Sequence, residues 1–202
     1  MRPTVTLTET ISTCFSNLMK NIGTSVPATV LSFDSSKQLA GIQIAILGVD
    51  GQGNDYEQPP ILSVPVFFAG SSHYSIQHEL HAGDEGIALF SQRCIDGFVN
   101  KGAGNPNPIL RFHDFNDAMF IPGLRSNPKK INSFNSSGIS IAKNDGSQSV
   151  TLKSNGDVEI TTDGDLVIDG IRFKDHTHDS GGLNILEDPS KTIQGNTGGI
   201  TT

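Results

Sequence analysis

Residues 150–173 read Val150-Thr-Leu-Lys-Ser-Asn-Gly-Asp157, Val158-Glu-Ile-Thr-Thr-Asp-Gly-Asp165 and Leu166-Val-Ile-Asp-Gly-Ile-Arg-Phe173. These stretches are copies of one eight-residue unit, a short alternating strand followed by an Asn-Gly or Asp-Gly turn. An earlier copy, Ile139-Ser-Ile-Ala-Lys-Asn-Asp-Gly146, is set apart by the insertion Ser147-Gln148-Ser149. The spacing predicts a repetitive β structure in the C-terminal part of the chain.

Alternation within the repeat places its apolar side chains on one face, because residues two positions apart in a strand project to the same side. This face contains Ile139, Ile141, Val150, Leu152, Val158, Ile160, Leu166 and Ile168, and the other contains Ser140, Thr151, Glu159 and Thr161. The apolar face has to be buried, either by stacking within one chain or between identical chains. About four units are few for a single-chain solenoid, so we favour three chains wound around a common axis, which also pairs the edge strands.

Upstream of the repeat, residues 26–124 predict a compact β domain. Its expected strands are Val26–Phe33, Leu39–Leu47, Val64–Phe68, Glu85–Ser91 and Ala118–Leu124. Short strands joined by polar or glycine-containing turns, such as Asp34–Lys37 and Gly83-Asp84, favour a small barrel of the OB-fold type, with a sandwich as the alternative. The composition changes after Ser126-Asn127-Pro128, beyond which aromatic residues are sparse.

An amphipathic helix is expected before the barrel. The apolar residues Ile11, Phe15, Leu18, Met19 and Ile22 form one stripe at helical spacing. Thr10 or Ser12 is expected to cap the helix, and Gly23 to end it. The stripe has two interpretations of equal weight, packing on its own domain and docking on a neighbouring protein.

The sequence therefore predicts an all-β chain with a short N-terminal helix, an OB-fold-like barrel, an intertwined trimeric β-helix and a small apex. The expected divisions are an N-terminal arm and helix at 1–24, the barrel at 25–124, a neck linker at 125–137, the β-helix at 138–174, and an apex and tail at 175–202.

Composition and motifs argue against several classes of function. The net charge of −7 leaves no surplus of Lys and Arg to contact nucleic acid. There is neither an 18-residue apolar run nor a secretory signal, and the isolated Cys14 and Cys94 are expected to be free thiols of a protein made in a reducing cytoplasm. Motifs of serine hydrolases, zinc proteases and phosphate-binding loops are absent, and with 21 acidic residues a pair such as Asp114 and Asp117 carries no information. We expect no enzymatic activity.

A metal site is predicted directly after the last repeat, where the chain reads Lys174-Asp175-His176-Thr-His178-Asp179. Both imidazoles project to one side of an extended backbone, so three chains meeting on an axis would bring six to one point. Six nitrogen ligands suit an octahedral first-row ion, Fe²⁺ first, with Ni²⁺ or Co²⁺ as alternatives. Such a saturated ion has no open position for substrate, which indicates a structural role. The other histidines, His73, His78, His81 and His113, follow no ligand spacing.

Several stretches resemble the membrane-piercing central spike proteins of contractile-tailed bacteriophages. They are residues 26–34, 64–68, 82–90 and 113–124, followed by the repeat and by His176-Thr-His178. The resemblance implies a homotrimer at the tip of the tail baseplate in the virion. Its N-terminal region would contact the tail hub, and one iron ion per trimer would be held at the point by His176 and His178. The implied function is mechanical piercing of the host outer membrane during sheath contraction. The alternatives are a non-piercing hub or adaptor of the baseplate and a glycan-binding or glycan-cleaving tail protein.

Overall fold

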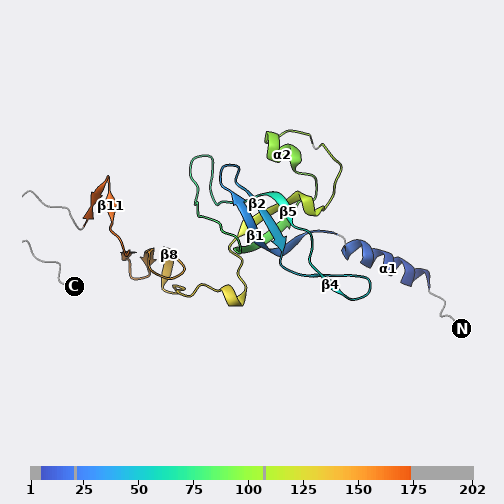
Figure 1. Cartoon of the computed structure of the whole chain (residues 1–202), viewed down its shortest axis with the longest axis horizontal. Helices are drawn as coiled ribbons and strands as arrows, with labels where there is room; N and C mark the ends of the chain where they lie inside the picture. The colour runs from blue at the N-terminus through green and yellow to red at the C-terminus, as the bar shows by residue number, and fades with distance from the viewer. Residues whose placement is uncertain (1–5, 21, 107, 174–202) are drawn as a thin grey trace, which may run out of the picture. The chain divides into compact units, whose positions relative to one another are not determined.

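The computed structural model describes residues 6–20, 22–106 and 108–173 (Figure 1). The chain divides into two compact units, Met1–Lys130 and Ile131–Thr202, each of which is described by itself. Both units consist mainly of β-strands, and a helix, α1 (Leu7–Lys20), precedes the first strand. The predicted all-β class with a short N-terminal helix is confirmed. No helix within these ranges has the length and apolar character needed to cross a membrane.

The N-terminal unit is built on a curved five-stranded sheet. Its order is β5-β2-β1-β6-β7, with β1 at Ser25–Asp34, β2 at Leu39–Ile44, β5 at Ile61–Pro65, β6 at Glu85–Phe90 and β7 at Ala118–Pro122. Neighbouring strands are antiparallel. The two edges meet through a parallel bridge between Val66 and Phe120, where the Phe67 N–H donates a 2.8 Å hydrogen bond to the Phe120 carbonyl. This order and closure give a small OB-fold-like barrel, as predicted.

Strand β1 belongs to both halves of the barrel. Ser25–Thr29 pairs with β6, and Ala28–Asp34 pairs with β2. A register shift between Val30 and Ser32 marks a bulge, which lets the long strand bend from one half to the other.

The barrel core is made mostly of aliphatic side chains. Its buried members are Ala28, Val30, Ala40, Ile42, Ile44, Ile61, Val64, Ala88, Phe90, Ala118 and Phe120. Phe120 is fully buried, and a Cβ atom at Gly86 would overlap its ring and the Ile121 carbonyl. Glycine at position 86 therefore makes room for the largest side chain in a core that has few aromatic residues.

Several local predictions were wrong in their boundaries. Helix α1 begins at Leu7, because Thr6 and not Thr10 or Ser12 provides the cap. The Glu9 N–H donates to the Thr6 hydroxyl at 3.2 Å, and the Thr6 N–H donates to the Glu9 carboxylate at 2.7 Å, which is a capping box. Strand β2 ends at Ile44, and β5 begins at Ile61. The sequence interpretation missed β3 (Gly48–Val49), β4 (Asp55–Tyr56), α2 (Asp96–Lys101) and the 3-10 turns Phe115–Asp117 and Asn127–Lys129.

The C-terminal unit contains the repeat as separate small sheets. Strands β8 (Gly138–Ala142), β9 (Ser149–Lys153) and β10 (Val158–Thr161) form an antiparallel sheet in the order β10-β9-β8. Strands β11 (Val167–Ile168) and β12 (Ile171–Arg172) form a hairpin. Its turn residues Asp169 and Gly170 have φ angles of 50° and 81°, as tight two-residue hairpin turns require.

Candidate functional site

The predicted metal ligands, His176 and His178, lie outside the described residues, as do the expected apex and tail. Two other features of the described chain bear on function. One is the uncovered face of the β8–β10 sheet, and the other is a buried polar network in the barrel.

The β8–β10 sheet carries six aliphatic side chains on one face, which we call the apolar face. Strand register aligns them in two rows, one of Ile139, Leu152 and Val158 and the other of Ile141, Val150 and Ile160. Their exposed fractions run from 45% at Val150 to 72% at Ile139. The predicted placement of these residues on one face is confirmed, and within the described unit nothing covers them.

The opposite face of this sheet is polar and more tightly packed. Thr151 is only 4% exposed, and its hydroxyl lies 2.7 Å from that of Ser140. The Asn135 amide donates to Ser140 at 2.6 Å, and the Lys153 ammonium pairs with Glu159 at 2.7 Å. The Glu159 carboxylate raises the pKa of Lys153. Within a single chain, the side chains of the polar face thus bind one another, and those of the apolar face stay exposed to water.

Helix α1 also exposes apolar side chains. Leu7, Ile11, Phe15, Leu18 and Met19 form its apolar stripe, and each is more than half exposed. Within the described residues, the stripe therefore does not pack on the barrel.

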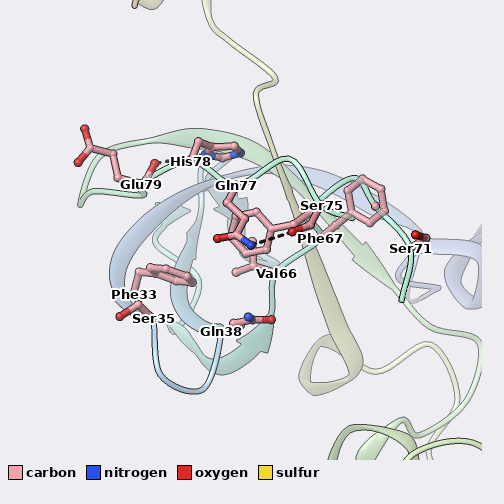
Figure 2. Close-up of a pocket in the computed structure, with 12 residues that line it drawn as sticks. Phe33, Ser35, Gln38, Val66, Phe67, Ser71, Ser75, Gln77, His78 and Glu79 are labelled. Carbon is pink, nitrogen blue, oxygen red and sulfur yellow. Dashed lines mark hydrogen bonds between the residues drawn. The ribbon is translucent and has the colours of Figure 1, made fainter. Parts of the chain in front are cut away.

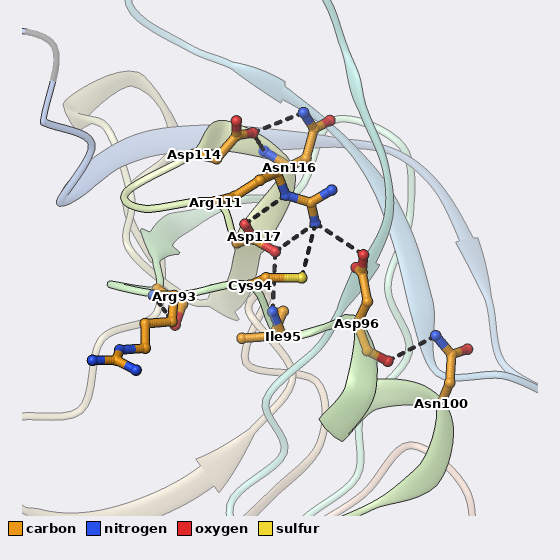
Figure 3. A network of polar contacts seen from close by, with 10 residues as sticks. Arg93, Cys94, Ile95, Asp96, Asn100, Arg111, Asp114, Asn116 and Asp117 are labelled. Atoms are coloured by element: carbon orange, nitrogen blue, oxygen red, sulfur yellow. Dashed lines mark hydrogen bonds and ion pairs between the residues drawn. The ribbon is translucent and has the colours of Figure 1, made fainter. Parts of the chain in front are cut away.

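The barrel contains a buried ion-pair network in the long connection between β6 and β7 (Figure 3). The Arg111 guanidinium binds Asp117 with two hydrogen bonds of 2.8 and 2.9 Å and reaches Asp96 at 3.0 Å. The Asp117 carboxylate is fully buried and also accepts the Ile95 N–H at 3.1 Å. The Arg111 hydrogen bonds lower the pKa of Asp117, and Asp117 in turn raises the pKa of Arg111. The network ties α2 and the flanking loops to the start of β7.

Three members of this network have the chemistry of metal ligands. The Cys94 sulfur and the Asp96 and Asp117 carboxylates offer ligand atoms that lie within 4.8 Å of one another. Arg111 donates to all three of them, including a 3.4 Å contact to the Cys94 sulfur. The guanidinium therefore already neutralises the negative charge that would attract a metal cation, and the cluster is structural.

The remaining residues that sequence analysis discussed have local roles. Asp114 caps the 3-10 turn by accepting the Asn116 N–H at 2.8 Å, while Asp117 is committed to Arg111. The structure thus gives each of these two acids a structural partner. The His113 ring lies 3.1 Å from the Gly23 carbonyl. Cys14 is exposed, Cys94 is buried, and both are free thiols, as predicted.

The Asp117 pair makes stability depend on pH in a defined direction. Because the folded-state pKa of Asp117 lies below the usual value, its stabilisation is present above about pH 4 and is lost as the pH falls through the folded pKa. The Asp117→Asn variant lacks this dependence. We expect the difference in melting temperature between parent and variant to be largest near pH 7 and to shrink below about pH 4. Calorimetry from pH 7 to pH 2.5 measures it, and a gap that stays constant with pH would contradict the assignment.

Comparison with known families adds an independent observation. Residues 26–123 match the model of a family described as the phage protein Gp138 N-terminal domain. The match indicates a phage structural protein. It runs from β1 to the end of β7, so it covers the barrel and the Arg111 network but neither α1 nor the C-terminal unit. No curated protein matches the chain. The match thus supports a phage tail or baseplate protein, with a location in the virion.

Proposed function

We propose that this protein is the spike at the tip of a phage tail baseplate, where it works as a homotrimer that pierces the host outer membrane when the sheath contracts. The observation that carries the proposal is the apolar face of the β8–β10 sheet. Six aligned aliphatic side chains exposed on a three-stranded sheet require a partner surface of the same kind, and identical chains provide one.

Three copies around an axis would stabilise this sheet in two ways, by burying its apolar face and by pairing its edge strands. Burying the six side chains would contribute on the order of 5–10 kcal/mol per chain, given their present exposure. Strands β8 and β10 are the edges of the sheet, and a neighbouring chain at each edge would pair their free backbone groups. The result would be a narrow, continuous β structure suited to bearing load.

The charge of the protein bears on how such a spike would be driven. Each chain carries −7, so an anionic outer membrane repels the assembly. Spontaneous insertion is therefore unfavourable, and the work of penetration has to come from the sheath. The role of the spike is to remain folded under force, and it requires no catalytic group.

Helix α1 is the part that would join the spike to the tail hub. Its capping box makes the helix begin at a defined residue, and its apolar stripe is exposed along its length. A hub groove with apolar residues would bury this stripe. Since the family match begins at residue 26, the attachment would lie outside the matched domain.

At the opposite end, we propose that His176 and His178 of three chains hold one Fe²⁺. Six imidazoles form a complete octahedral donor set, so a bound ion would crosslink the chain ends and do no catalysis. Native mass spectrometry with elemental analysis tests the proposal as a whole, with three chains and one iron as the expected result. A stable monomer that contains no transition metal would contradict it.

The ligand assignment has a sharper test. We expect the His176→Ala/His178→Ala variant to lose its iron completely while its barrel unfolds at an unchanged temperature, because the last barrel strand, β7, ends at Pro122, well before these residues in the sequence. The matched control is His73→Ala/His81→Ala, which removes two exposed histidines of the barrel unit and should keep one iron per trimer. Iron retained in the first variant would show that the ligands lie elsewhere.

A further inference from the structure

A cleft of about 510 Å³ opens on the surface of the barrel (Figure 2). Three segments form its walls: the β1–β2 turn with Ser35 and Gln38, the stretch Val66–Phe68 after β5, and the following loop from Gly70 to Glu79. Its volume lies within the range of small-molecule sites, about 300–1,000 Å³. The Arg111 network and the apolar face play no part in it.

One wall of the cleft is a row of aromatic rings. The Phe33 and Phe68 centroids are 6.2 Å apart, and those of Phe68 and His78 are 5.4 Å apart, with interplanar angles near 60°. Phe67 adds a ring that is 55% exposed. Aromatic faces carry negative charge density and attract the weakly positive C–H groups of a ligand. The apolar side of a pyranose ring presents such C–H groups as a flat array.

The other walls carry neutral polar groups. The side chains of Ser35 and Gln38 have no hydrogen-bond partner among the described residues, so both are available to a ligand. The Gln77 amide contacts Ser75 at 2.7 Å, and Ser71 and Glu79 complete the lining. Amides and hydroxyls both donate and accept, which suits the vicinal hydroxyls of a sugar. Since no lining residue is Lys or Arg, the cleft is unsuited to phosphates and nucleic acids.

The polar segments are held in place before any ligand arrives. Asp34 accepts hydrogen bonds from the Ser36 and Lys37 backbone N–H groups at 3.0 and 3.2 Å, which fixes the β1–β2 turn. Gln38 has a φ of 56°, a left-handed conformation that is uncommon for residues other than glycine. In the facing loop, a bridge joins Gly70 and Ser75, and the Ser71 N–H donates to the Tyr74 carbonyl at 2.6 Å. Such preorganisation lowers the entropic cost of binding.

We propose that this cleft binds a neutral saccharide, with a pyranose ring stacked on the aromatic row and its hydroxyls bonded to Gln38 and Gln77. The barrel would then contact a glycan while the C-terminal unit acts mechanically. The proposal does not depend on the spike function, because it uses only the barrel.

Saturation-transfer NMR on the full-length assembly tests this with maltotriose, mannotriose and triacetylchitotriose, and with trigalacturonic acid as the charged comparison. We expect transfer to at least one neutral trisaccharide and weaker transfer to the acid, which Glu79 repels. Phe68→Ala should raise the dissociation constant at least about tenfold, which is about 1.4 kcal/mol. Because Phe68 also packs on Phe33, His78→Ala and Gln38→Gly serve as milder variants, each with an expected loss of at least about fivefold.

The matched control is Tyr74→Ala. Tyr74 lies on the same loop and is 83% exposed, but it does not line the cleft, so binding should stay unchanged. The proposal is wrong if no neutral trisaccharide shows transfer, or if the three cleft variants bind like the parent. It is also wrong if a synthetic peptide of residues 6–22 occupies the cleft and no sugar does, since the cleft would then be a docking site for α1.

Discussion

Replacing Ile160 by aspartate is expected to convert the proposed trimer to monomers. Ile160 lies on the apolar face in one row with Ile141 and Val150, and it is 49% exposed in the single chain. A half-exposed aspartate is tolerated in a monomer. On assembly each carboxylate would lose its water without gaining a partner, at a cost of at least about 3 kcal/mol per chain. With three such charges brought together near one axis, the association should fail at micromolar protein concentrations.

The matched control is the adjacent residue. Thr161 also belongs to β10 but projects to the polar face, so Thr161→Asp adds the same charge one position along the chain and should leave the trimer intact. Sedimentation velocity distinguishes the species directly. The assembly model is wrong if the parent sediments as a monomer, or if the Ile160 variant stays trimeric and melts at the parent temperature.

The second large effect is expected from Arg111→Met. This change leaves the fully buried Asp117 carboxylate without its charged partner, so that among the described residues it keeps only neutral donors, the Ile95 N–H and the Cys94 thiol. Removing one partner of a buried ion pair typically costs about 3–5 kcal/mol. In a barrel of this size the melting temperature should fall by more than about 10 °C, which calorimetry measures.

Two further variants separate the buried pair from general effects of removing an arginine. Arg93 lies in the same connection, where its guanidinium is 5.9 Å from the centre of the exposed Phe112 ring, so Arg93→Met should cost less than about 1 kcal/mol. The double variant Arg111→Met/Asp117→Leu removes the stranded charge and should recover at least half of the loss. If Arg93→Met and Arg111→Met destabilise equally, the network does not have the role that we assign to it.

Periodicity made the C-terminal sheet predictable from sequence. Alternation alone placed Ile141, Val150 and Ile160 on one face, and the strand register confirms it. The strands of the barrel were found in the same way, because β-branched residues bounded by polar turns mark them. Such patterns depend only on neighbours within a few residues, and this is the information that a single sequence displays.

Features that depend on distant contacts were missed, and so were some local features outside the periodic stretches. Asp117 and Asp96 were two acids among 21 until the fold brought both to Arg111. Helix α1 starts at Leu7 because Thr6 and Glu9 cap each other, a pair that lies before the apolar stripe used to predict the helix. The two-residue strands β3 and β4 are too short for alternation to show.

The candidate sites differ in the same way: one was suggested by neighbouring residues, and the other depends on residues that are distant in sequence. His176 and His178 were proposed because they are close in sequence, and they stay a prediction. The cleft could not be proposed from sequence, because Phe33 lies at the end of β1, Gln38 in the turn after it, and His78 in a loop forty residues later. No spacing rule relates them. Their segments come together because β2 pairs with β5 and the Val66 N–H donates to the Gln38 carbonyl at 3.2 Å.

The position of β6 between β1 and β7 has a mechanical consequence. Since β6 runs antiparallel to both, the first and last strands of the barrel run parallel, and the chain enters beside Leu89 and leaves beside Gly86. Tension applied between entry and exit therefore slides the three strands along one another. All rungs of both ladders then share the stress at once, whereas peeling would break them one after another, so this barrel is built to be stiff along the direction in which its chain is pulled.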